Sequence, residues 1–133
     1  MTRNQTWLTE LMPNVFVEMS PELANQQGIK SGDRVLVKTA RGALGGWALV
    51  TNRFRPFKMN GTEVHQIGVP WHWGFQGSSC GCSANALTPH VGDANTMIPE
   101  YKAFLCAVEK SPYQYDRLFV PLSERVEEPH VIK

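Results

Sequence analysis

The chain has few cysteines, little net charge and no long apolar run, and each absence narrows the class of protein. Its 133 residues include three cysteines, an odd number that argues against a framework of disulfides. The formal net charge is +1, and lysine and arginine occur singly, so nucleic-acid binding is not expected. No apolar run approaches the length of about 18 residues that spans a bilayer. No signal peptide is recognisable, so direct membrane insertion is not expected either.

The three cysteines do not predict a metal or redox site. Cys80 and Cys82 are separated by one residue, whereas common zinc and redox motifs have two or more, and no second Cys/His pair lies at ligand spacing. We therefore interpret them as loop thiols rather than metal ligands or a redox pair. Cys106 lies in the apolar run 104–108 and is expected to be a small core residue.

The rest of the composition predicts one folded domain with many turns. Of the residues, 42% are hydrophobic and 19% charged, and the chain is long enough to bury a core without disulfides or metal. The 11 glycines and 9 prolines favour turns and short strands over long helices. We expect the folded domain to cover residues 1–110. The tail over 111–133 has three prolines and no sustained period, and is expected to be irregular.

Two short helical segments are predicted from their end signals. Residues 7–12 form a short amphipathic turn that Pro13 closes. The second helix covers residues 22–27, with Ser20 as N-cap, Pro21 at the first helical position and Gly28 for a left-handed end. Both segments lie near the N-terminus, so the rest of the chain is expected to consist of strands and loops.

Five stretches are predicted to be strands, at residues 15–17, 34–39, 44–52, 63–68 and 103–109. Residues 40–43 supply a hairpin turn, and Asn60-Gly61 marks a tight turn before the fourth strand. Gly45-Gly46 inside the third strand predicts a bulge or a bend. These features indicate a mainly β fold, a closed or nearly closed β-barrel with one or two short helices and long loops.

Residues 65–74 concentrate chemistry that an ordinary core does not need. This stretch, HQIGVPWHWG, holds two of the four tryptophans and two of the four histidines, together with two glycines and a proline. A polar loop over residues 75–99 follows it, rich in glycine, asparagine and threonine. Glycines let backbone N–H groups approach phosphate, amides and carboxylates pair with a heterocycle edge, and indole rings offer a stacking surface. The two loops predict a site for a polar, planar, phosphate-bearing ligand.

Each of these residues also has a structural interpretation. His72 could be a hydrogen-bonded core histidine, but its polar, glycine-rich surroundings favour contact with a ligand. Of the two tryptophans Trp71 and Trp73, one is expected to pack inward and the other to face the ligand. The asparagines and aspartate of the following loop are common turn formers, because their side chains cap neighbouring backbone N–H groups.

Six runs together resemble one family. They are MSPELA (19–24), GIKSGDRV (28–35), TARG (39–42), HQIGVPWHWG (65–74), NALTP (85–89) and IPEYK (98–102). In this order they resemble the C-terminal domain of molybdenum- or tungsten-dependent formate dehydrogenase α subunits. That domain is the molybdopterin-dinucleotide-binding domain of the dimethyl-sulfoxide-reductase superfamily. The run 28–33 is shared across the superfamily, whereas 65–74 and 99–102 resemble formate dehydrogenases in particular.

The resemblance implies a double-psi β-barrel over residues 1–110 that closes over molybdopterin guanine dinucleotide. It also implies that the molybdenum or tungsten, its Cys or selenocysteine ligand, the active-site His and Arg and the iron–sulfur cysteines belong to earlier domains. We therefore expect no catalytic residue and no metal ligand in this segment, which alone should be inactive and without cofactor. The expected partners are the remaining domains of the same large subunit and an iron–sulfur electron-transfer subunit. The compartment, periplasmic or cytoplasmic, would follow from the N-terminus of the parent chain.

The residues expected to contact the cofactor come from several separate parts of the chain. They are Thr2, Arg3, Thr39, Arg41, His65, Gln66, Gly68, Trp71, His72, Trp73, Gly74, Asn85, Asp93, Asn95, Tyr101 and Lys102. Residues 65–74, 85–95 and 101–102 are expected to converge at one mouth. There Lys102 would meet a phosphate, Asn85 and Asp93 a heterocycle edge and His72 a pterin oxygen.

A second hypothesis, of a different class, is a stand-alone double-psi barrel that acts as a protein-interaction or substrate-recognition module. The sequence that precedes Met1 in the gene distinguishes the two hypotheses. A catalytic domain with the Cys or selenocysteine ligand there supports the cofactor-binding hypothesis.

Overall fold

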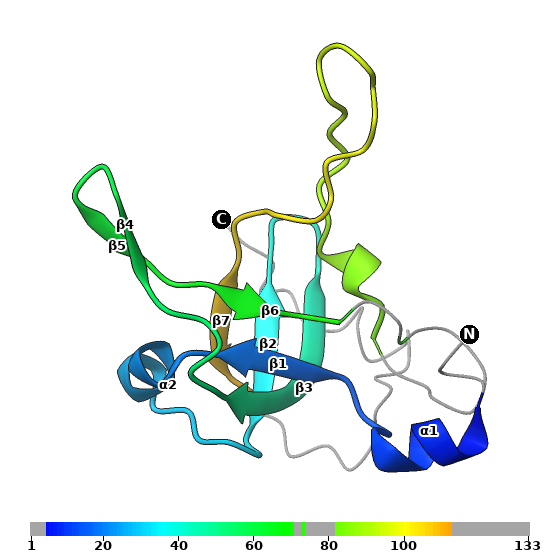
Figure 1. Ribbon diagram of the computed structural model, residues 1–133, viewed down its shortest axis with the longest axis vertical. Helices are drawn as coiled ribbons and strands as arrows, with labels where there is room; N and C mark the ends of the chain where they lie inside the picture. Colours follow the sequence, from blue (N-terminus) through cyan, green and yellow to red (C-terminus); the bar gives the residue numbers. More distant parts are fainter. Residues whose placement is uncertain (1–4, 71–72, 74–81, 113–133) are drawn as a thin grey trace.

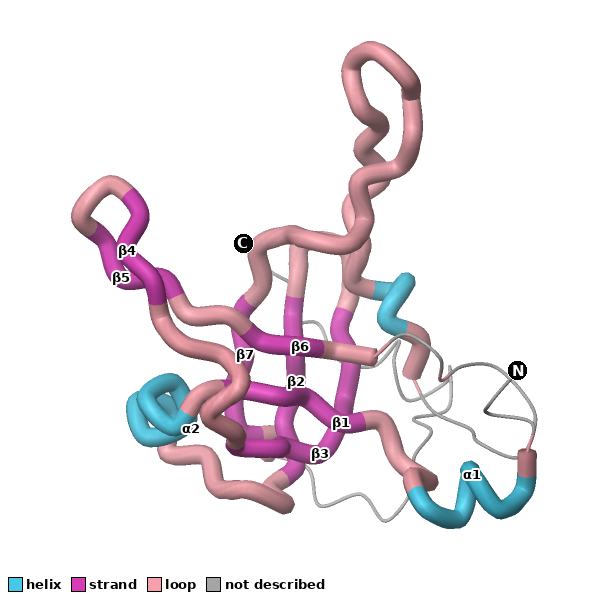
Figure 2. The backbone as a smooth tube through the Cα atoms, in the orientation of Figure 1, coloured by secondary structure: helices cyan, strands magenta, loops and turns pink. Residues whose placement is uncertain are grey.

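The computed structural model describes residues 5–70, 73 and 82–112. They form a five-stranded sheet of order β6-β1-β3-β2-β7 and a separate two-stranded hairpin, β4-β5 (Figure 1). The sheet contains β1 (Phe16–Met19), β2 (Arg34–Lys38), β3 (Ala43–Val50), β6 (Ile67–Gly68) and β7 (Ala107–Lys110). It curls into a half-barrel in which β1 and β6 cross in front of β2 and β3 (Figure 2). The predicted mainly β, barrel-like architecture is confirmed.

β3 joins the two halves of the sheet. Its first part pairs antiparallel with β2, and its last part pairs parallel with β1. Trp47 is paired on both sides, opposite Arg34 of β2 and Phe16 of β1. Because the strand changes partner at this residue, the sheet bends there, and the two halves face each other across the core.

Of the two features predicted for Gly45-Gly46, a bulge or a bend, the bulge is absent. The β2–β3 register runs unbroken through both glycines, opposite Leu36 and Val35. Gly46 instead permits a close approach of β1, since a Cβ at this position would lie 3.1 Å from Val17 Cγ2. The glycine therefore serves strand packing rather than a break in the ladder.

Alternate residues of the central strands fill the core, as the period of a half-buried strand requires. The buried apolar residues are Val15, Val17, Met19, Leu23, Ala24, Ile29, Val35, Val37, Leu44, Ala48, Trp73, Ala84 and Leu87. Each large member contributes about 1.5–3 kcal/mol on burial. The core thus fixes the sheet and the helix that covers one of its ends.

The helix α2 (Pro21–Gln27) has the predicted ends. The Ser20 hydroxyl accepts a hydrogen bond from the Leu23 N–H at 3.2 Å, and Gly28 closes the helix at φ +64°. The first helix, α1 (Thr6–Leu11), occupies the predicted amphipathic segment. None of the helices in the described residues has the length and apolar character needed to cross a bilayer.

The predicted strand over residues 63–68 is in fact two strands with different partners. β5 (Thr62–Val64) pairs with β4 (Phe57–Met59) in a projecting hairpin, whereas β6 pairs with β1. Asn60 and Gly61 have φ of 50° and 80° and form the predicted tight turn, so the first half of the stretch pairs locally. Phe57, which lies outside the strands predicted from the sequence, begins β4 because the same turn brings it opposite Val64.

The predicted last strand, 103–109, begins later, at Ala107, where pairing with Lys38 starts. Cys106 precedes this ladder and is exposed, so its prediction as a core residue was wrong. Cys82 is partly buried against the core, and Cys80 lies outside the described residues. Part of the predicted long loop is ordered as a 3-10 turn (Ala84–Ala86) and a projecting arm, residues 88–100, closed by a bridge between Gly92 and Pro99 (Figure 1).

Candidate functional site

A groove of about 1080 Å³ lies between the β4–β5 hairpin, the core face of the sheet and residues 101–108. Three segments that are distant in sequence supply most of its polar lining. They contribute His65 and Gln66, Asn85 and Thr88, and Tyr101 and Lys102. The fold therefore brings together five of the residues expected to contact a cofactor, with Thr88 as an addition.

The groove also has apolar walls that the sequence analysis missed. Phe57 and Met59 on β4 and Leu105 before β7 line it and are exposed. Residues 57 and 59 stand two apart on one strand and thus share a face, which is a signal readable in the sequence. The groove combines a polar end with an apolar rim.

His65 has one ring nitrogen near a carboxylate and one that is buried without a hydrogen bond to the described residues. Its Nε2 lies 3.4 Å from Oε1 of Glu63, a further groove residue that the sequence analysis missed. Its Nδ1 is buried and has no hydrogen-bond partner among the residues that the structure describes. A buried polar atom without a partner costs about 1–3 kcal/mol, so a ligand group that bonds to Nδ1 would stabilise this arrangement.

Arg55 lies near the start of α2. Hydrogen bonds from its own backbone N–H and the Ser20 hydroxyl lower the pKa of Glu22, and the charge of the nearby Arg55 contributes less. Arg55 is exposed in the connection before β4 and is not among the residues that line the groove.

Local hydrogen bonds hold Asn85 at the groove. The Ser83 hydroxyl accepts from the Asn85 N–H at 3.3 Å, and the Thr88 hydroxyl donates to the Asn85 carbonyl oxygen at 3.0 Å. Asn85 itself is exposed. The turn therefore fixes the backbone and presents the amide side chain, which has both a donor and an acceptor.

Thr39 and Arg41 support this turn rather than line the groove. The Thr39 hydroxyl donates to the Leu87 carbonyl at 3.0 Å and accepts from the Arg41 N–H at 3.2 Å. At the neighbouring Gly42 a Cβ would lie 2.7 Å from the Ala86 carbonyl oxygen. The β2–β3 turn thus packs directly on the 84–86 turn that presents Asn85.

Asp93 and Asn95 lie on the arm, away from the groove lining. Asp93 Oδ1 accepts from the Thr96 N–H at 2.8 Å, the Thr96 hydroxyl at 2.9 Å and the Asn95 N–H at 3.0 Å. These bonds, with that from the Thr96 backbone foremost, lower the pKa of Asp93. Both residues shape the tip of the arm, in line with their interpretation as turn formers.

Trp73 packs in the core and is 4% exposed. Its Nε1 donates to the Pro13 carbonyl at 3.3 Å, and its ring meets that of Phe16 edge-on at 5.9 Å. Trp73 therefore packs inward and does not line the groove. Thr2, Arg3, Trp71, His72 and Gly74 lie outside the described residues. The described part of the chain contains no group of three His, Cys, Asp or Glu that could hold a metal.

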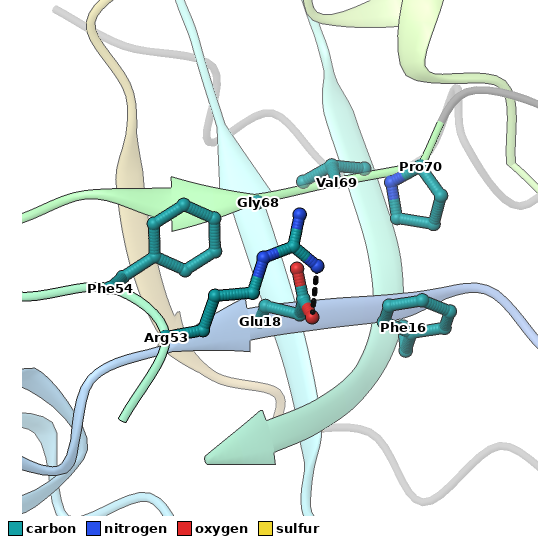
Figure 3. Close-up of a pocket in the computed structure, with 7 residues that line it drawn as sticks. All are labelled: Phe16, Glu18, Arg53, Phe54, Gly68, Val69 and Pro70. Carbon is teal, nitrogen blue, oxygen red and sulfur yellow. Dashed lines mark hydrogen bonds and ion pairs between the residues drawn. The ribbon is translucent and has the colours of Figure 1, made fainter. Parts of the chain in front are cut away.

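Gly68 lines a second, smaller pocket of about 230 Å³ on the outer side of β1 and β6. Figure 3 shows Glu18 and Arg53 at its centre, with an ion pair of 3.1 Å, and Phe54 and Phe16 at its two ends. Phe54 and Val69 line both this pocket and the large groove. They form a wall between the two.

Comparison with known proteins identifies the family of the chain. The family model described as "Molydopterin dinucleotide binding domain" matches residues 1–105. The chain belongs to the molybdopterin dinucleotide-binding domain family. The match includes the three segments that supply most of the polar lining of the groove. This family membership confirms the resemblance seen in the sequence and associates the domain with a molybdopterin-type cofactor.

Large subunits of formate dehydrogenases are among the relatives of this molybdopterin-binding domain. The domain is 50% identical over 112 residues to formate dehydrogenase subunit alpha of Megalodesulfovibrio gigas. The aligned region makes up 84% of this chain and 11% of that protein. It is 51% identical over 100 residues to the major subunit of the nitrate-inducible formate dehydrogenase of Escherichia coli, covering 74% and 10%. Formate dehydrogenase 2 subunit alpha (cytochrome c-553) of Nitratidesulfovibrio vulgaris is 47% identical over 110 residues, covering 83% and 11%. The chain spans about a tenth of the length of these relatives.

Proposed function

We propose that this domain holds molybdopterin guanine dinucleotide in the groove, as part of the large subunit of a molybdenum or tungsten formate dehydrogenase that oxidises formate to carbon dioxide. The main support is that three distant segments bring His65, Asn85 and Lys102 to one groove of a molybdopterin-binding domain. The partners in this proposal are the other domains of the same subunit and an iron–sulfur electron-transfer subunit. The proposed cofactor-binding unit is residues 1–110, with 111–133 as an additional tail.

The lining residues fit the chemistry of such a cofactor. The Lys102 ammonium can meet a phosphate, a charge-assisted contact that contributes about 1.5–3 kcal/mol, and the Asn85 amide can pair with the edge of a guanine or pterin. His65 Nδ1 offers a buried acceptor or donor that has no partner among the described residues. The bound cofactor supplies the metal-centred redox chemistry, and this chain binds, orients and covers it.

The test is the cofactor content of the purified parent subunit. Metal and released guanine nucleotide are measured per folded protein for Asn85→Ala, Lys102→Met and the control Lys30→Met, which removes an exposed cation from a turn outside the groove. We expect several-fold lower occupancy in the first two variants and wild-type occupancy in the control. His72→Ala belongs to the same series as a prediction from the sequence. Full occupancy in both groove variants would place the cofactor elsewhere.

A further inference from the structure

The smaller pocket, on the outer side of β1 and β6, is also lined by residues of the connection that follows β3. Glu18 of β1 pairs in register with Gly68 of β6. Its carboxylate Oε1 accepts a hydrogen bond at 3.1 Å from Arg53, whose guanidinium lies 5.5 Å from the centroid of the Phe54 ring. Glu18, Arg53 and Phe54 thus form a continuous cluster over the β1–β6 pair (Figure 3).

The Phe54 ring is seated on Gly68. A Cβ at position 68 would lie 2.8 Å from Phe54 Cε2 and Cζ and 3.0 Å from Glu18 Oε2. Only a glycine therefore lets both the ring and the carboxylate lie against β6 without displacement. Since Glu18 is the cross-strand partner of Gly68, the cluster holds both strands of this pair from the same side.

β6 depends on such support because it is short. It consists of two residues, and its ladder to β1 has two register pairs. Two groove residues, His65 and Gln66, directly precede β6 in the chain. Phe54, part of the wall between the two pockets, also lines the groove. Loss of the cluster would therefore change the polar end of the groove without touching the central strands.

We propose that Glu18, Arg53 and Phe54 are positioning residues for the groove: they clamp β6 onto β1 and so fix His65, Gln66 and the Phe54 wall where the cofactor binds. This inference rests on the proposed function. The two charged members differ in exposure, with side chains 14% exposed for Glu18 and 69% for Arg53. Removal of the arginine leaves a mostly buried carboxylate without its cation, so the effect exceeds that of an ordinary surface ion pair.

The experiment uses the parent subunit with Arg53→Met, Arg53→Lys, Phe54→Leu and a matched control, Lys110→Met. Lys110 forms an ion pair of 2.9 Å with Asp33, its side chain is 54% exposed, and it lies on β7, which does not pair with β6. Two quantities are measured for each variant. They are amide hydrogen exchange of peptides spanning residues 62–70, and guanine nucleotide content per folded protein.

We expect Arg53→Met and Phe54→Leu to speed exchange at residues 65–70 by about threefold or more and to lower occupancy by about two- to fivefold. Exchange in β2 and β3 should stay unchanged. Arg53→Lys keeps the charge and should recover part of both effects, and Lys110→Met should match the wild type. Wild-type exchange at residues 65–70 in Arg53→Met would overturn the proposal. Faster exchange with full occupancy would also overturn it, because the cluster would then support the strand alone.

Failure of the proposed function gives a different result. A wild-type subunit that carries metal but no guanine nucleotide contradicts the identity of the cofactor, and metal content then serves as the occupancy readout. A wild-type subunit with neither contradicts the proposed function, and the positioning role of the cluster falls with it.

Discussion

The curled sheet and the segments that project from it differ in what stabilises them. The central strands place Val17, Val37 and Leu44 at 0% exposure in the core. The β4–β5 hairpin and the arm instead expose much of their apolar surface, with Met59 54% and Met97 74% exposed. The sheet is therefore held by burial, and the projecting segments are held by turns and a few polar contacts.

The difference shows how the domain divides its tasks. The groove has one wall from the sheet, through Val37 and Val108, and other walls from the hairpin and residues 101–106. Of the polar groove residues, Gln66, Asn85 and Lys102 are exposed and come from connections, whereas no charged side chain of β2 or β3 lines the groove. Changes in the sheet should thus affect stability, and changes in the connections should affect ligand binding.

The largest effect is expected for Val37→Asp. The side chain is 0% exposed, so the substitution buries a carboxylate without a partner and should cost about 4 kcal/mol or more of unfolding free energy. Urea unfolding of the 133-residue chain measures this. Leu49→Asp, at a position that is 40% exposed on β3, is the control and should cost far less. Equal costs at both positions would contradict the core assignment.

Gly42→Ala tests the contact between the sheet and the turn that presents Asn85. The new Cβ would lie 2.7 Å from the Ala86 carbonyl oxygen, a backbone atom, so one of the two turns must move. Overpacking of this kind costs about 1–3 kcal/mol. We expect a loss of stability together with lower cofactor occupancy in the parent subunit. Gly45→Ala is the control, since a Cβ there meets nothing within 4 Å.

Much of the local structure could be predicted because it depends on residues close in sequence. The Ser20 cap, the Gly28 helix end and the Asn60-Gly61 turn are each decided within a few residues. The exposure of Cys106 and the division of residues 63–68 could not be predicted in this way. They depend on where β2 and β1 offer a free edge, which is settled by tertiary pairing.

The candidate site shows the same division. The types of residue expected at a dinucleotide site indicated His65, Gln66, Asn85, Tyr101 and Lys102, all of which line the groove. The same reasoning selected Asp93, whose carboxylate instead caps a turn on the arm. Ligand-binding and turn-forming asparagine or aspartate have the same sequence signature, so only the position in the fold separates them.

A smaller effect is expected from the two serine caps. Ser20→Ala removes the buried cap of α2 and should lower the unfolding free energy by about 1 kcal/mol. Ser83→Ala removes the cap of the exposed 84–86 turn and should lower it by much less, since that cap holds one 3-10 turn at the groove. Denaturant midpoints at equal m-values measure both. A larger loss of stability for Ser83→Ala than for Ser20→Ala would contradict the inference that the connections contribute less to stability than the rest of the fold.

The smallest effect is the pH dependence of the arm. The pKa of Asp93 is lowered in the fold, so its stabilising hydrogen bonds are present above the unfolded pKa of about 3.9 and are lost as pH falls through the lower folded value. Amide exchange of residues 93–98, corrected for the intrinsic rate at each pH, should become faster below about pH 4. Asp93→Asn should abolish this pH dependence. A pH response that persists in the variant would point to another group.

β3 also determines where the chain tolerates a change of length. Its register is specified twice, by β2 over Ala43–Trp47 and by β1 over Trp47–Val50, with Trp47 common to both ladders. An inserted or deleted residue on either side of Trp47 would keep one pairing and shift the other by one, turning its side chains to the opposite face. Insertions should therefore be accommodated at the tips of the β4–β5 hairpin and the arm, where one local turn absorbs them.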